Sequence, residues 1–436
     1  MKRLLSSHLG QLLQWTLLAL PVAILAGSAT AFFLWSLDKA TVLQWQHPQL
    51  LWGLPLAGVG VGLLYHYLGK GSERGNNLLI EEIHEPGGGV PARMAPLVLF
   101  GTLVTHLCGG SAGREGTAVQ MGGSIAGLLA RTFKLSPQHR KLMLLSGIAA
   151  GFGAVFGTPL TGAIFAMEVL VVGRLQYEAI IPVLVASIVG DATCTAWGIH
   201  HTPYHLDVAP GAGSHAAFDV ILLSKVALGG ICFGLMGRFF AELTHAMHDL
   251  FAKLVPFAPL RPAVGGVIVI ALVYLLGTRD YLGLGVTSPQ EHGVSIVSSF
   301  EAGGAHPWSW LWKTLFTAVT LGGGFKGGEV TPLFYIGSTL GNTLGVLLHE
   351  PVALFAALGF VAVFAGAANT PLACTVMGIE LFGAHYGVYF GVACFVAYFF
   401  SGHTGIYLSQ RLGVKKRPAK GKDAEGITLR EARKKG

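Results

Sequence analysis

Two glycine-rich stretches, far apart in the chain, decide how this sequence folds. Residues 109–117 read Gly-Gly-Ser-Ala-Gly-Arg-Glu-Gly-Thr, and residues 323–331 read Gly-Gly-Phe-Lys-Gly-Gly-Glu-Val-Thr. At this offset of 214 positions three glycines, the glutamate and the threonine coincide. Gly123-Ser124 and Gly337-Ser338 extend the match. Self-similarity at one fixed spacing indicates an internal duplication.

A second pair of segments follows the first in the same order. Thr158-Pro159-Leu160 precedes Glu168 by the spacing that separates Thr370-Pro371-Leu372 from Glu380. We therefore predict two repeats, at about residues 14–200 and 218–400, inside a membrane domain of residues 1–414. The sequence alone does not settle whether the repeats are parallel or inverted.

The composition identifies a membrane protein. Only 12% of the 436 residues are charged, against about 25% in a typical soluble domain. Many uncharged runs reach the roughly 20 residues that cross a bilayer as a helix. These runs lie at residues 4–37, 40–69, 94–113, 142–167, 330–349, 351–379 and 381–410. Shorter apolar runs at 116–130, 179–190, 226–237 and 262–278 suggest tilted, broken or re-entrant helices. Continuous apolar runs exclude a β-barrel, whose strands alternate.

The net charge of +7 comes from the end of the chain. Residues 415–436 hold nine Lys or Arg and three Asp or Glu. A basic segment after the last span is the positive-inside signal, and Lys2 and Arg3 give the same signal at the start. We expect both termini in the cytoplasm, a disordered tail at 415–436, and no role for nucleic acid. Five scattered cysteines indicate neither a disulfide framework nor a metal site.

The glycine-rich stretches have the chemistry of anion sites. A helix that starts after such a turn presents unpaired N–H groups and the positive end of its dipole. Matching helix starts in two halves could therefore bind one anion near the midplane. The alternative is close helix packing by small residues, which is our interpretation of Gly58, Gly60 and Gly62. For residues 113–117 and 327–331 we favour anion binding.

Glu115 is a charged group between two apolar runs. An ionised carboxylate there must pair, reach water or take up a proton. Beside an anion it competes when ionised and withdraws when neutral, which would couple anion movement to proton movement. The alternative is a structural salt bridge with Arg114. Adjacent residues on a helix do not face each other, so we favour the gating role.

These segments resemble a known family. Gly113-Arg114-Glu115-Gly116-Thr117 is similar to the GREGP signature of the CLC chloride channel and transporter family. Residues 327–332 lie where that family has its GxFxP signature, and residues 157–162 resemble the segment after the first signature. The resemblance runs from about residue 14 to Leu412. It implies an all-α polytopic inverted-repeat bundle with broken and re-entrant helices, a homodimer, and an anion site of helix amino termini.

The same resemblance assigns two residues to the site. It places the gating glutamate at Glu115. It also places an anion-contacting tyrosine, found near the last helix in many members, at Tyr407 in Gly405-Ile406-Tyr407-Leu408. The alternative for Tyr407 is a tyrosine of the interfacial belt.

Departures from the chloride pattern resemble the bacterial fluoride/proton antiporters of the family. Where chloride members have a GSGIP-type serine, the nearest match here is Gly75-Asn76-Asn77. Thr117 replaces the proline of the first signature, and Glu329, Val330 and Thr331 stand in the second. Fluoride holds water more strongly than chloride does, so its site needs denser donors. An Asn amide offers two donors and a serine one. Asn76 and Asn77 could instead be turn residues, and the sequence does not rank them.

Glu329 is the candidate second proton site. Many family antiporters carry an internal glutamate after the one matched by Glu168, and that position is Val169 here. The alternative for Glu329 is a pair with Lys326, three residues away; Lys326 could otherwise raise the local positive potential. We expect Glu168 and Glu380 to stabilise helix ends.

The sequence therefore predicts a fluoride/proton antiporter of the bacterial inner membrane. It would export fluoride in exchange for protons and so oppose the entry of HF, giving fluoride resistance. The alternative is a chloride/proton exchanger or a passive chloride channel of the same family. An enzyme is disfavoured because His106 and Ser111 lie in no His-Glu-x-x-His or Gly-x-Ser-x-Gly pattern. We expect no cofactor and no metal, with the lipid bilayer, the anion and protons as the partners.

Overall fold

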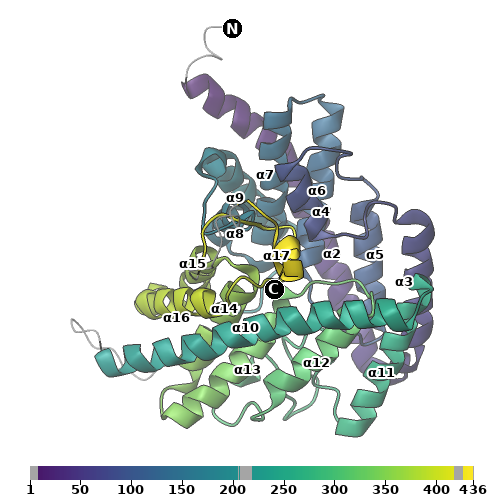
Figure 1. The fold of residues 1–436 in the computed structure, drawn as a ribbon, viewed down its shortest axis with the longest axis vertical. Coiled ribbons are helices and arrows are strands. Elements are labelled where there is room, and N and C mark those ends of the chain that lie inside the picture. The colour runs from purple at the N-terminus through teal and green to yellow at the C-terminus, as the bar shows by residue number, and fades with distance from the viewer. Residues whose placement is uncertain (1–7, 205, 207–218, 417–425, 436) are drawn as a thin grey trace.

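The computed structural model describes residues 8–204, 206, 219–416 and 426–435. Two series of helices follow each other (Figure 1). The first consists of α2 (His8–Gln46), α3 (Leu54–Leu68), α4 (Asn76–His84), α5 (Met94–Leu107), α6 (Glu115–Thr132), α7 (Pro137–Phe156), α8 (Pro159–Glu168) and α9 (Ile180–Ala196). The second consists of α10 (Val220–Leu254), α11 (Arg261–Leu276), α12 (Ser309–Gly322), α13 (Val330–Leu348), α14 (Val352–Ala368), α15 (Pro371–Phe382) and α16 (Gly387–Phe400).

Short elements complete the chain. The 3-10 turns are η1 (Pro48–Gly53), η2 (Tyr177–Ala179), η3 (Ala258–Leu260), η4 (Ser298–Phe300) and η5 (Ala384–Tyr386). A two-residue parallel pair joins β1 (Val171–Val172) to β2 (Arg411–Leu412), and α17 (Leu429–Lys435) ends the described chain. The fold is therefore helical, as the continuous apolar runs predict.

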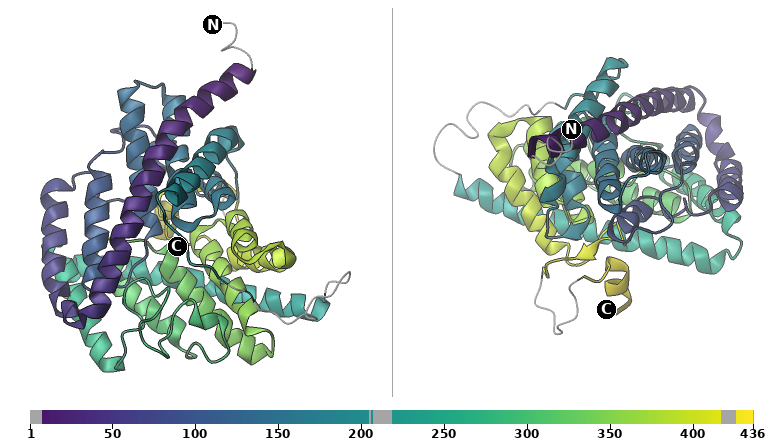
Figure 2. Two further views of the ribbon diagram at one scale, coloured as in Figure 1. Left: turned by 180° about the vertical axis from the view of Figure 1, so that it is seen from behind. Right: turned by 90° about the horizontal axis from the view of Figure 1, so that it is seen from above.

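Apart from α4, the helices of the first series have counterparts in the same order in the second, which is the pattern that a duplication predicts. The long first helices α2 and α10 have 39 and 35 residues, and α10 crosses the molecule in Figure 1 while α2 runs along its back in Figure 2. The helices after the glycine-rich stretches, α6 and α13, have 18 and 19 residues. The short helices α8 and α15 have 10 and 12. Among the described residues, α4 has no helical counterpart in the second series.

Reciprocal caps show that the repeats are inverted. Glu168 at the end of α8 accepts hydrogen bonds from the amides of Leu372 (3.0 Å) and Ala373 (2.8 Å) at the start of α15. Glu380 near the end of α15 accepts from the amides of Leu160 (2.9 Å) and Thr161 (2.8 Å) at the start of α8. Each carboxylate therefore satisfies donors that a helix leaves unpaired. The two helices run antiparallel, and the expectation that both glutamates stabilise helix ends is confirmed.

The core of the molecule lies around α7 and α14. Residues 353–368 of α14 are all buried, as expected of a helix that is apolar on every side. Aromatic rings join the halves: Phe152 of α7 lies 6.3 Å from Phe364 of α14, centroid to centroid. Phe334 of α13 stacks on Phe360 of α14 at 3.9 Å. This rigid centre holds the glycine-rich stretches in register.

Uncharged runs do not coincide with single helices. The run at 142–167 breaks between α7 and α8, where Gly157 adopts φ +71° and Pro159 begins the next helix. The run at 351–379 breaks in the same way, with Asn369 at φ +59° before Pro371. Conversely, α2 continues through Asp38 and Lys39, which separate the uncharged runs at 4–37 and 40–69. Two charges near one end of a long helix do not end it.

Glycines bring the helix pairs into close contact. A Cβ at Gly337 of α13 would overlap the carbonyl oxygen of Gly359 in α14, and one at Gly151 of α7 would lie 2.5 Å from the carbonyl oxygen of Ala118 in α6. The packing interpretation of Gly58 and Gly62 is confirmed, because their Cβ atoms would overlap the backbone at Pro262 and Pro259. It is wrong for Gly60, which has open space there.

In the part of the chain that the structure describes, five helical stretches are long and apolar enough to cross a membrane by length and composition: residues 13–46, 48–68, 177–196, 220–254 and 258–276. Four shorter apolar helices accompany them, at 94–107, 352–368, 371–382 and 384–400. The mixture of long spans with short apolar helices is the pattern expected of broken and re-entrant segments.

The predicted disorder of the tail is wrong for residues 426–435. Their backbone pairs with the segment before them: Leu412 N–H donates to Ile427 (2.9 Å), and Arg430 N–H donates to Leu408 (3.0 Å). Leu429 is only 2% exposed, against Val172 and Leu412. An apolar contact that the charged composition conceals therefore fixes α17. Residues 417–425 lie outside the described chain.

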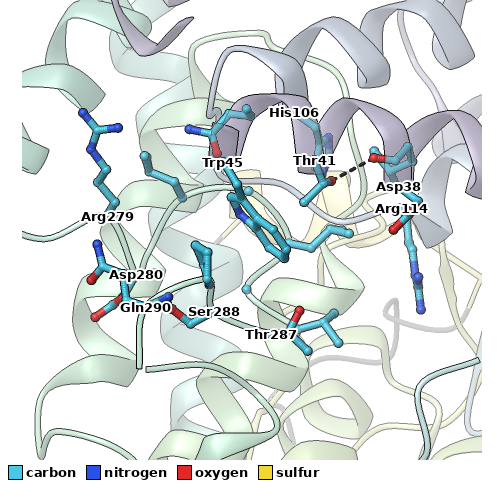
Figure 3. A pocket seen from close by; sticks show the side chains of 18 of the residues that line it. Asp38, Thr41, Trp45, His106, Arg114, Arg279, Asp280, Thr287, Ser288 and Gln290 are labelled. Atoms are coloured by element: carbon cyan, nitrogen blue, oxygen red, sulfur yellow. Dashed lines mark hydrogen bonds between the residues drawn. The ribbon is translucent and has the colours of Figure 1, made fainter. Parts of the chain in front are cut away.

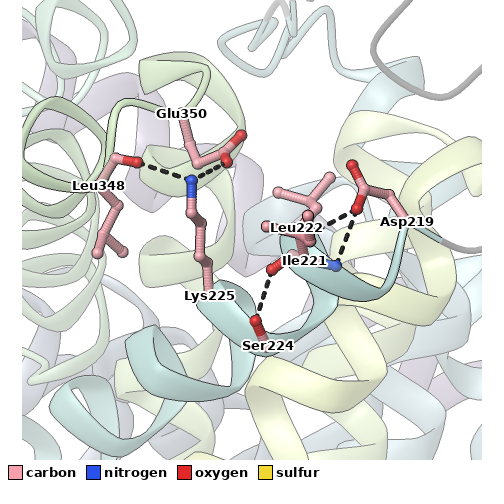
Figure 4. A network of polar contacts seen from close by, with 7 residues as sticks. All are labelled: Asp219, Ile221, Leu222, Ser224, Lys225, Leu348 and Glu350. Carbon is pink, nitrogen blue, oxygen red and sulfur yellow. Dashed lines mark hydrogen bonds and ion pairs between the residues drawn. The ribbon is translucent and has the colours of Figure 1, made fainter.

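Polar contacts fix the start of the second repeat (Figure 4). The Asp219 carboxylate caps α10 by accepting from the amides of Ile221 (2.9 Å) and Leu222 (3.1 Å). One turn later, Lys225 donates to Glu350 (2.6 Å) and to the Leu348 carbonyl (3.0 Å). The long helix is thus joined to the connection between α13 and α14.

Candidate functional site

The two glycine-rich stretches meet at the centre of the molecule. Gly113 N–H donates to Gly328 O at 2.6 Å, and Gly328 N–H donates to Gly113 O at 2.8 Å. No side chain fits there: a Cβ at Gly113 would lie 2.8–2.9 Å from Pro332, Glu115 and Gly328. The starts of α6 and α13 are therefore held against each other across the repeat boundary.

The Glu115 carboxylate lies in this junction and is 0% exposed. Its Oε2 accepts from the Thr331 amide at 3.0 Å and from the Arg114 amide at 3.1 Å. Its Oε1 accepts a short hydrogen bond from the Thr331 hydroxyl. A side chain of the first repeat thus takes the free donors at the first turn of α13 in the second. Val330, the first residue of α13, is 1% exposed beside it.

Arg114 does face Glu115, against the expectation that adjacent residues cannot pair. Its Nε lies 3.5 Å from Glu115 Oε1. The expectation was wrong because Arg114 precedes the helix as its N-cap, with φ −117°, so helical spacing does not apply to it. Glu115 therefore has a cationic neighbour, Arg114, in addition to the hydrogen-bond donors at the start of α13.

A third helix start reaches the same place. Asn76 opens α4, and a Cβ at Gly116 would lie 3.2 Å from its amide nitrogen and 3.7 Å from Glu329 Oε2. The other amide atom, Asn76 Oδ1, is buried and has no hydrogen-bond partner in the structure. The amino ends of α4, α6 and α13 therefore converge, which is the arrangement that binds anions.

The two asparagines have different positions. Asn77 Oδ1 accepts from the Ser409 amide at 2.9 Å, and the Ser409 hydroxyl donates to Glu81 at 2.7 Å. Asn77 thus holds the segment that follows Tyr407, and Asn76 is the one that faces Gly116 and Glu329. Sequence reasoning missed Ser409, since a serine beyond the last apolar run carries no signal of its own.

Two further predicted residues, Thr117 and Tyr407, lie near the junction. The Thr117 hydroxyl is 2.7 Å from that of Thr102 in α5, so its side chain joins two helices and its contribution to the site is the helix backbone. Tyr407 is 4% exposed and contacts Phe165 edge to face at 6.4 Å. The belt interpretation of Tyr407 is therefore wrong. The sequence did not predict Thr102 as a neighbour of Thr117, because α5 approaches Thr117 only in the folded protein.

Lys326 does not pair with Glu329. Its ammonium lies 4.1 Å from the centroid of the Tyr65 ring, a cation–π contact with α3. The residue turns away because the backbone between them passes through Gly327 and Gly328 and is not helical. Glu329 is left with its carboxylate toward Gly116 and Asn76.

A cavity of about 400 Å³ leads toward the junction from one side (Figure 3). We call it the vestibule; it lies between the last turns of α2 and the chain from 279 to 294. Arg114 and His106 lie at its inner end. The lining mixes apolar residues with polar ones, and the polar members include Asp38, Thr41, Gln44, Arg279, Asp280, Thr287, Ser288 and Gln290. Glu115 is 0% exposed and does not line this cavity, whereas its neighbour Arg114 does, so Arg114 lies between the cavity and the carboxylate.

A second cavity, of about 740 Å³, lies on the other side. It opens between α4 and the segment at 408–411, and α17 covers part of it. Charged residues line it: Arg74, Glu81, Glu82, His84, Glu85, Arg411, Arg430, Glu431 and Lys434. The junction of α4, α6 and α13 therefore lies between two polar cavities.

Inverted repeats around a buried polar junction define a polytopic membrane transporter or channel, not an enzyme. Comparison with known proteins then identifies the family. The family model described as "Voltage gated chloride channel" matches residues 57–402. The chain belongs to this CLC family.

Individual relatives agree with the family. The chain is 50% identical over 406 residues to a "Chloride/fluoride channel protein" of Pseudomonas syringae pv. tomato, covering 92% of this chain and 87% of that one. It is similar to the crystal structure of a CLC-type fluoride/proton antiporter, with TM-score 0.86, 34% identity, and coverage of 93% and 99%. A slow cyanobacterial Cl⁻/H⁺ antiporter shares the fold, with TM-score 0.72, 19% identity, and coverage of 89% and 94%.

Proposed function

We propose that this protein is a fluoride/proton antiporter that exports fluoride, with Glu115 as its gate. One observation carries the proposal: the Glu115 carboxylate accepts from both the amide and the hydroxyl of Thr331. A carboxylate oxygen in that position stands in for a small anion. The same donors serve a fluoride ion when the carboxylate leaves, and the carboxylate leaves most easily when a proton neutralises it.

The donor chemistry supports fluoride over chloride. Small, strongly hydrated anions need short, charge-assisted hydrogen bonds to replace their water. Thr331 supplies a hydroxyl and an amide in one turn, and the Asn76 amide nitrogen lies on the other side of Gly116. The relative named as a chloride/fluoride channel protein and the fluoride/proton antiporter of known structure are consistent with this preference.

Glu329 is the second proton site in this proposal. Its carboxylate lies on the side of Gly116 that faces Asn76, away from the vestibule. A carboxyl group there accepts a proton from Glu115, or passes one to it, over a short path. Because Val169 occupies the usual inner position, Glu329, whose carboxylate lies close to Gly116, is the candidate that remains besides Glu115.

The test uses purified protein in liposomes loaded with fluoride or chloride. Fluoride efflux with proton uptake is expected, and chloride efflux at the same rate would refute the selectivity. Glu115→Gln should abolish proton uptake. Glu85→Gln is the matched control, since Glu85 lines the second cavity at its exposed edge, paired with Arg411. Coupling that survives Glu115→Gln would remove Glu115 from the mechanism.

The second candidate is a chloride/proton exchanger or a passive chloride channel. It is favoured by the more distant relatives, among them an H(+)/Cl(−) exchange transporter of Yersinia pestis that is 28% identical over 309 residues. The same liposomes decide between these functions: proton uptake driven by chloride indicates the exchanger, and chloride flux without protons indicates the channel.

The proposal includes an inner-membrane homodimer with both termini in the cytoplasm. Apolar side chains on α8, α9 and α16 are about half exposed, as a partner surface or lipid would require: Leu160, Ile180, Ile188, Val388, Phe395 and Phe399. Cross-linking of single cysteines at these positions tests the dimer. Labelling of a cysteine placed at Lys434 from the cytoplasmic side alone tests the orientation.

A further inference from the structure

A group of buried polar atoms without partners lies beside the gate. Within the described residues, eight buried side-chain nitrogen or oxygen atoms have no hydrogen-bond partner. Four of them belong to Asp191 of α9, His201 beyond its end, Thr158 before α8, and Arg114. An unpartnered buried polar group costs about 1–3 kcal/mol, so four on neighbouring segments need an explanation.

Several contacts place the four residues around one space. His201 Nε2 lies 3.9 Å from Asp191 Oδ1, too far for a direct hydrogen bond and suitable for one bridging water. The His201 ring lies against Gly157, the residue before Thr158. Arg114 is near enough to His201 to affect its charge. The side chains of His201 and Asp191 are 19% and 23% exposed, although their facing atoms are buried.

The charged and titratable neighbours of this space come from several elements. Glu380 of α15 and Cys194 of α9 are near Asp191, and His200 is near His201. Burial lowers the pKa of His201 to about 4, with the Arg114 guanidinium acting in the same direction. The ring is therefore neutral at pH 7, with one nitrogen that donates and one that accepts.

Two residues relate this group to both the vestibule and the gate. Thr202, the neighbour of His201, lines the vestibule together with Arg114. On the inner side, the unpartnered Arg114 Nε is 3.5 Å from Glu115 Oε1. Polar groups of this kind are ordinarily bridged by buried water, and bridging water beside a carboxylate and a neutral imidazole forms a path for protons.

We propose that Asp191 and His201, with Thr158 and Arg114, enclose a buried hydrated site that delivers protons from the vestibule to Glu115. A hydronium ion that enters the hydrated site from the vestibule, where Thr202 and Arg114 line the wall, gives its proton to Asp191. The proton then passes through the bridging water and the His201 ring until an O–H bond forms at Glu115 as the last donor's bond breaks. No electrons are transferred and the water is regenerated. This inference rests on the proposed role of Glu115.

The test compares Asp191→Asn and His201→Phe with wild type in fluoride-loaded liposomes. The maximal rate of coupled exchange should fall about 100-fold, the lower end of what a positioned proton-transfer group contributes. The fluoride-to-proton ratio should not change, since Glu115 sets it. The slowing in D₂O should be larger in the variants than in wild type, because proton delivery becomes the slow step. Asp38→Asn, which removes a carboxylate of the vestibule wall outside the proposed relay, is the control and should match wild type.

The outcomes separate this inference from the proposed function. Wild type that moves fluoride without protons, or coupling that survives Glu115→Gln, refutes the gate itself. If wild type couples the two ions and Asp191→Asn exchanges at the wild-type rate, only the relay is refuted. A slow Asp191→Asn variant with the wild-type D₂O effect also refutes the relay, because it indicates structural damage. Unfolding temperatures in detergent identify variants that fail to fold. If Asp191→Asn does not fold, the exchange rate and D₂O effect of His201→Phe test the relay instead.

Discussion

The Thr331 hydroxyl is the most informative single group to remove. It donates to Glu115 Oε1, and the Thr331 amide donates to Oε2 at 3.0 Å. Thr331→Val keeps the branched shape and the backbone donor and deletes only the hydroxyl. Because the residue is 1% exposed, water cannot readily replace the lost donor. The substitution therefore isolates one hydrogen bond to the site.

The expected loss of anion affinity in Thr331→Val follows from the charge of the hydrogen-bond acceptor. A hydrogen bond to a charged group contributes about 1.5–3 kcal/mol, and each 1.4 kcal/mol is about tenfold in an equilibrium constant. The affinity of the site for a bound anion should fall about 10- to 100-fold. Two amide donors to Glu115 remain, from Thr331 and Arg114, so the lower part of this range is expected.

The assay is the fluoride concentration dependence of proton-coupled exchange in liposomes. The fluoride KM of Thr331→Val should rise about tenfold or more if the lost charge-assisted bond served the anion. Thr339→Val is the matched control: it is 0% exposed on the same helix, and its hydroxyl donates to the Tyr335 carbonyl at 2.8 Å, away from Glu115. Equal KM values for the two variants would refute the assignment of the α13 donors to the anion.

Three further predictions concern stability. Glu380→Gln should lower the free energy of unfolding by about 1–3 kcal/mol, since it weakens the charged cap on α8, which thermal unfolding in detergent measures. Gly337→Ala should prevent normal packing against Gly359, and Gly60→Ala, with open space around it, should fold like wild type; a folded Gly337→Ala would contradict the close contact. Asp219→Ala should cost about 1 kcal/mol by removing the α10 cap, and an unchanged unfolding temperature would show that this cap is dispensable.

The duplication was predictable because the residues that reveal it are ones that the backbone geometry requires. Only glycine fits at residue 113, where a Cβ would meet Glu115 and Gly328, so the two junction segments remain similar although their side chains differ. Glu168 and Glu380 are recognisable for a related reason, because each caps a helix of the opposite repeat. Features fixed by the symmetry of the fold recur at a constant spacing.

Features that depend on one contact were not predictable. The sequence does not distinguish Asn76 from Asn77, since their roles differ only through the position of Ser409, more than 300 residues away. The charged composition of the tail likewise gave no indication of α17. A single buried leucine, Leu429, holds this helix in place. The pairing of Arg114 with Glu115 required the backbone angle at the helix start.

The division of the site between the repeats bears on how exchange could be obligatory. The Glu115 carboxylate belongs to α6 and the two Thr331 donors belong to α13, and the contact between Gly113 and Gly328 fixes the separation of the two helices. One set of donors at Thr331 can hold the carboxylate or a fluoride ion, and two anions at that distance repel each other. Under the proposed function, fluoride therefore enters at lowest cost when Glu115 carries a proton, and Glu115 returns as an anion when fluoride leaves. Under the proposed function, the coupling then requires no large movement of either repeat, only the rotation of one side chain between two fixed helix starts.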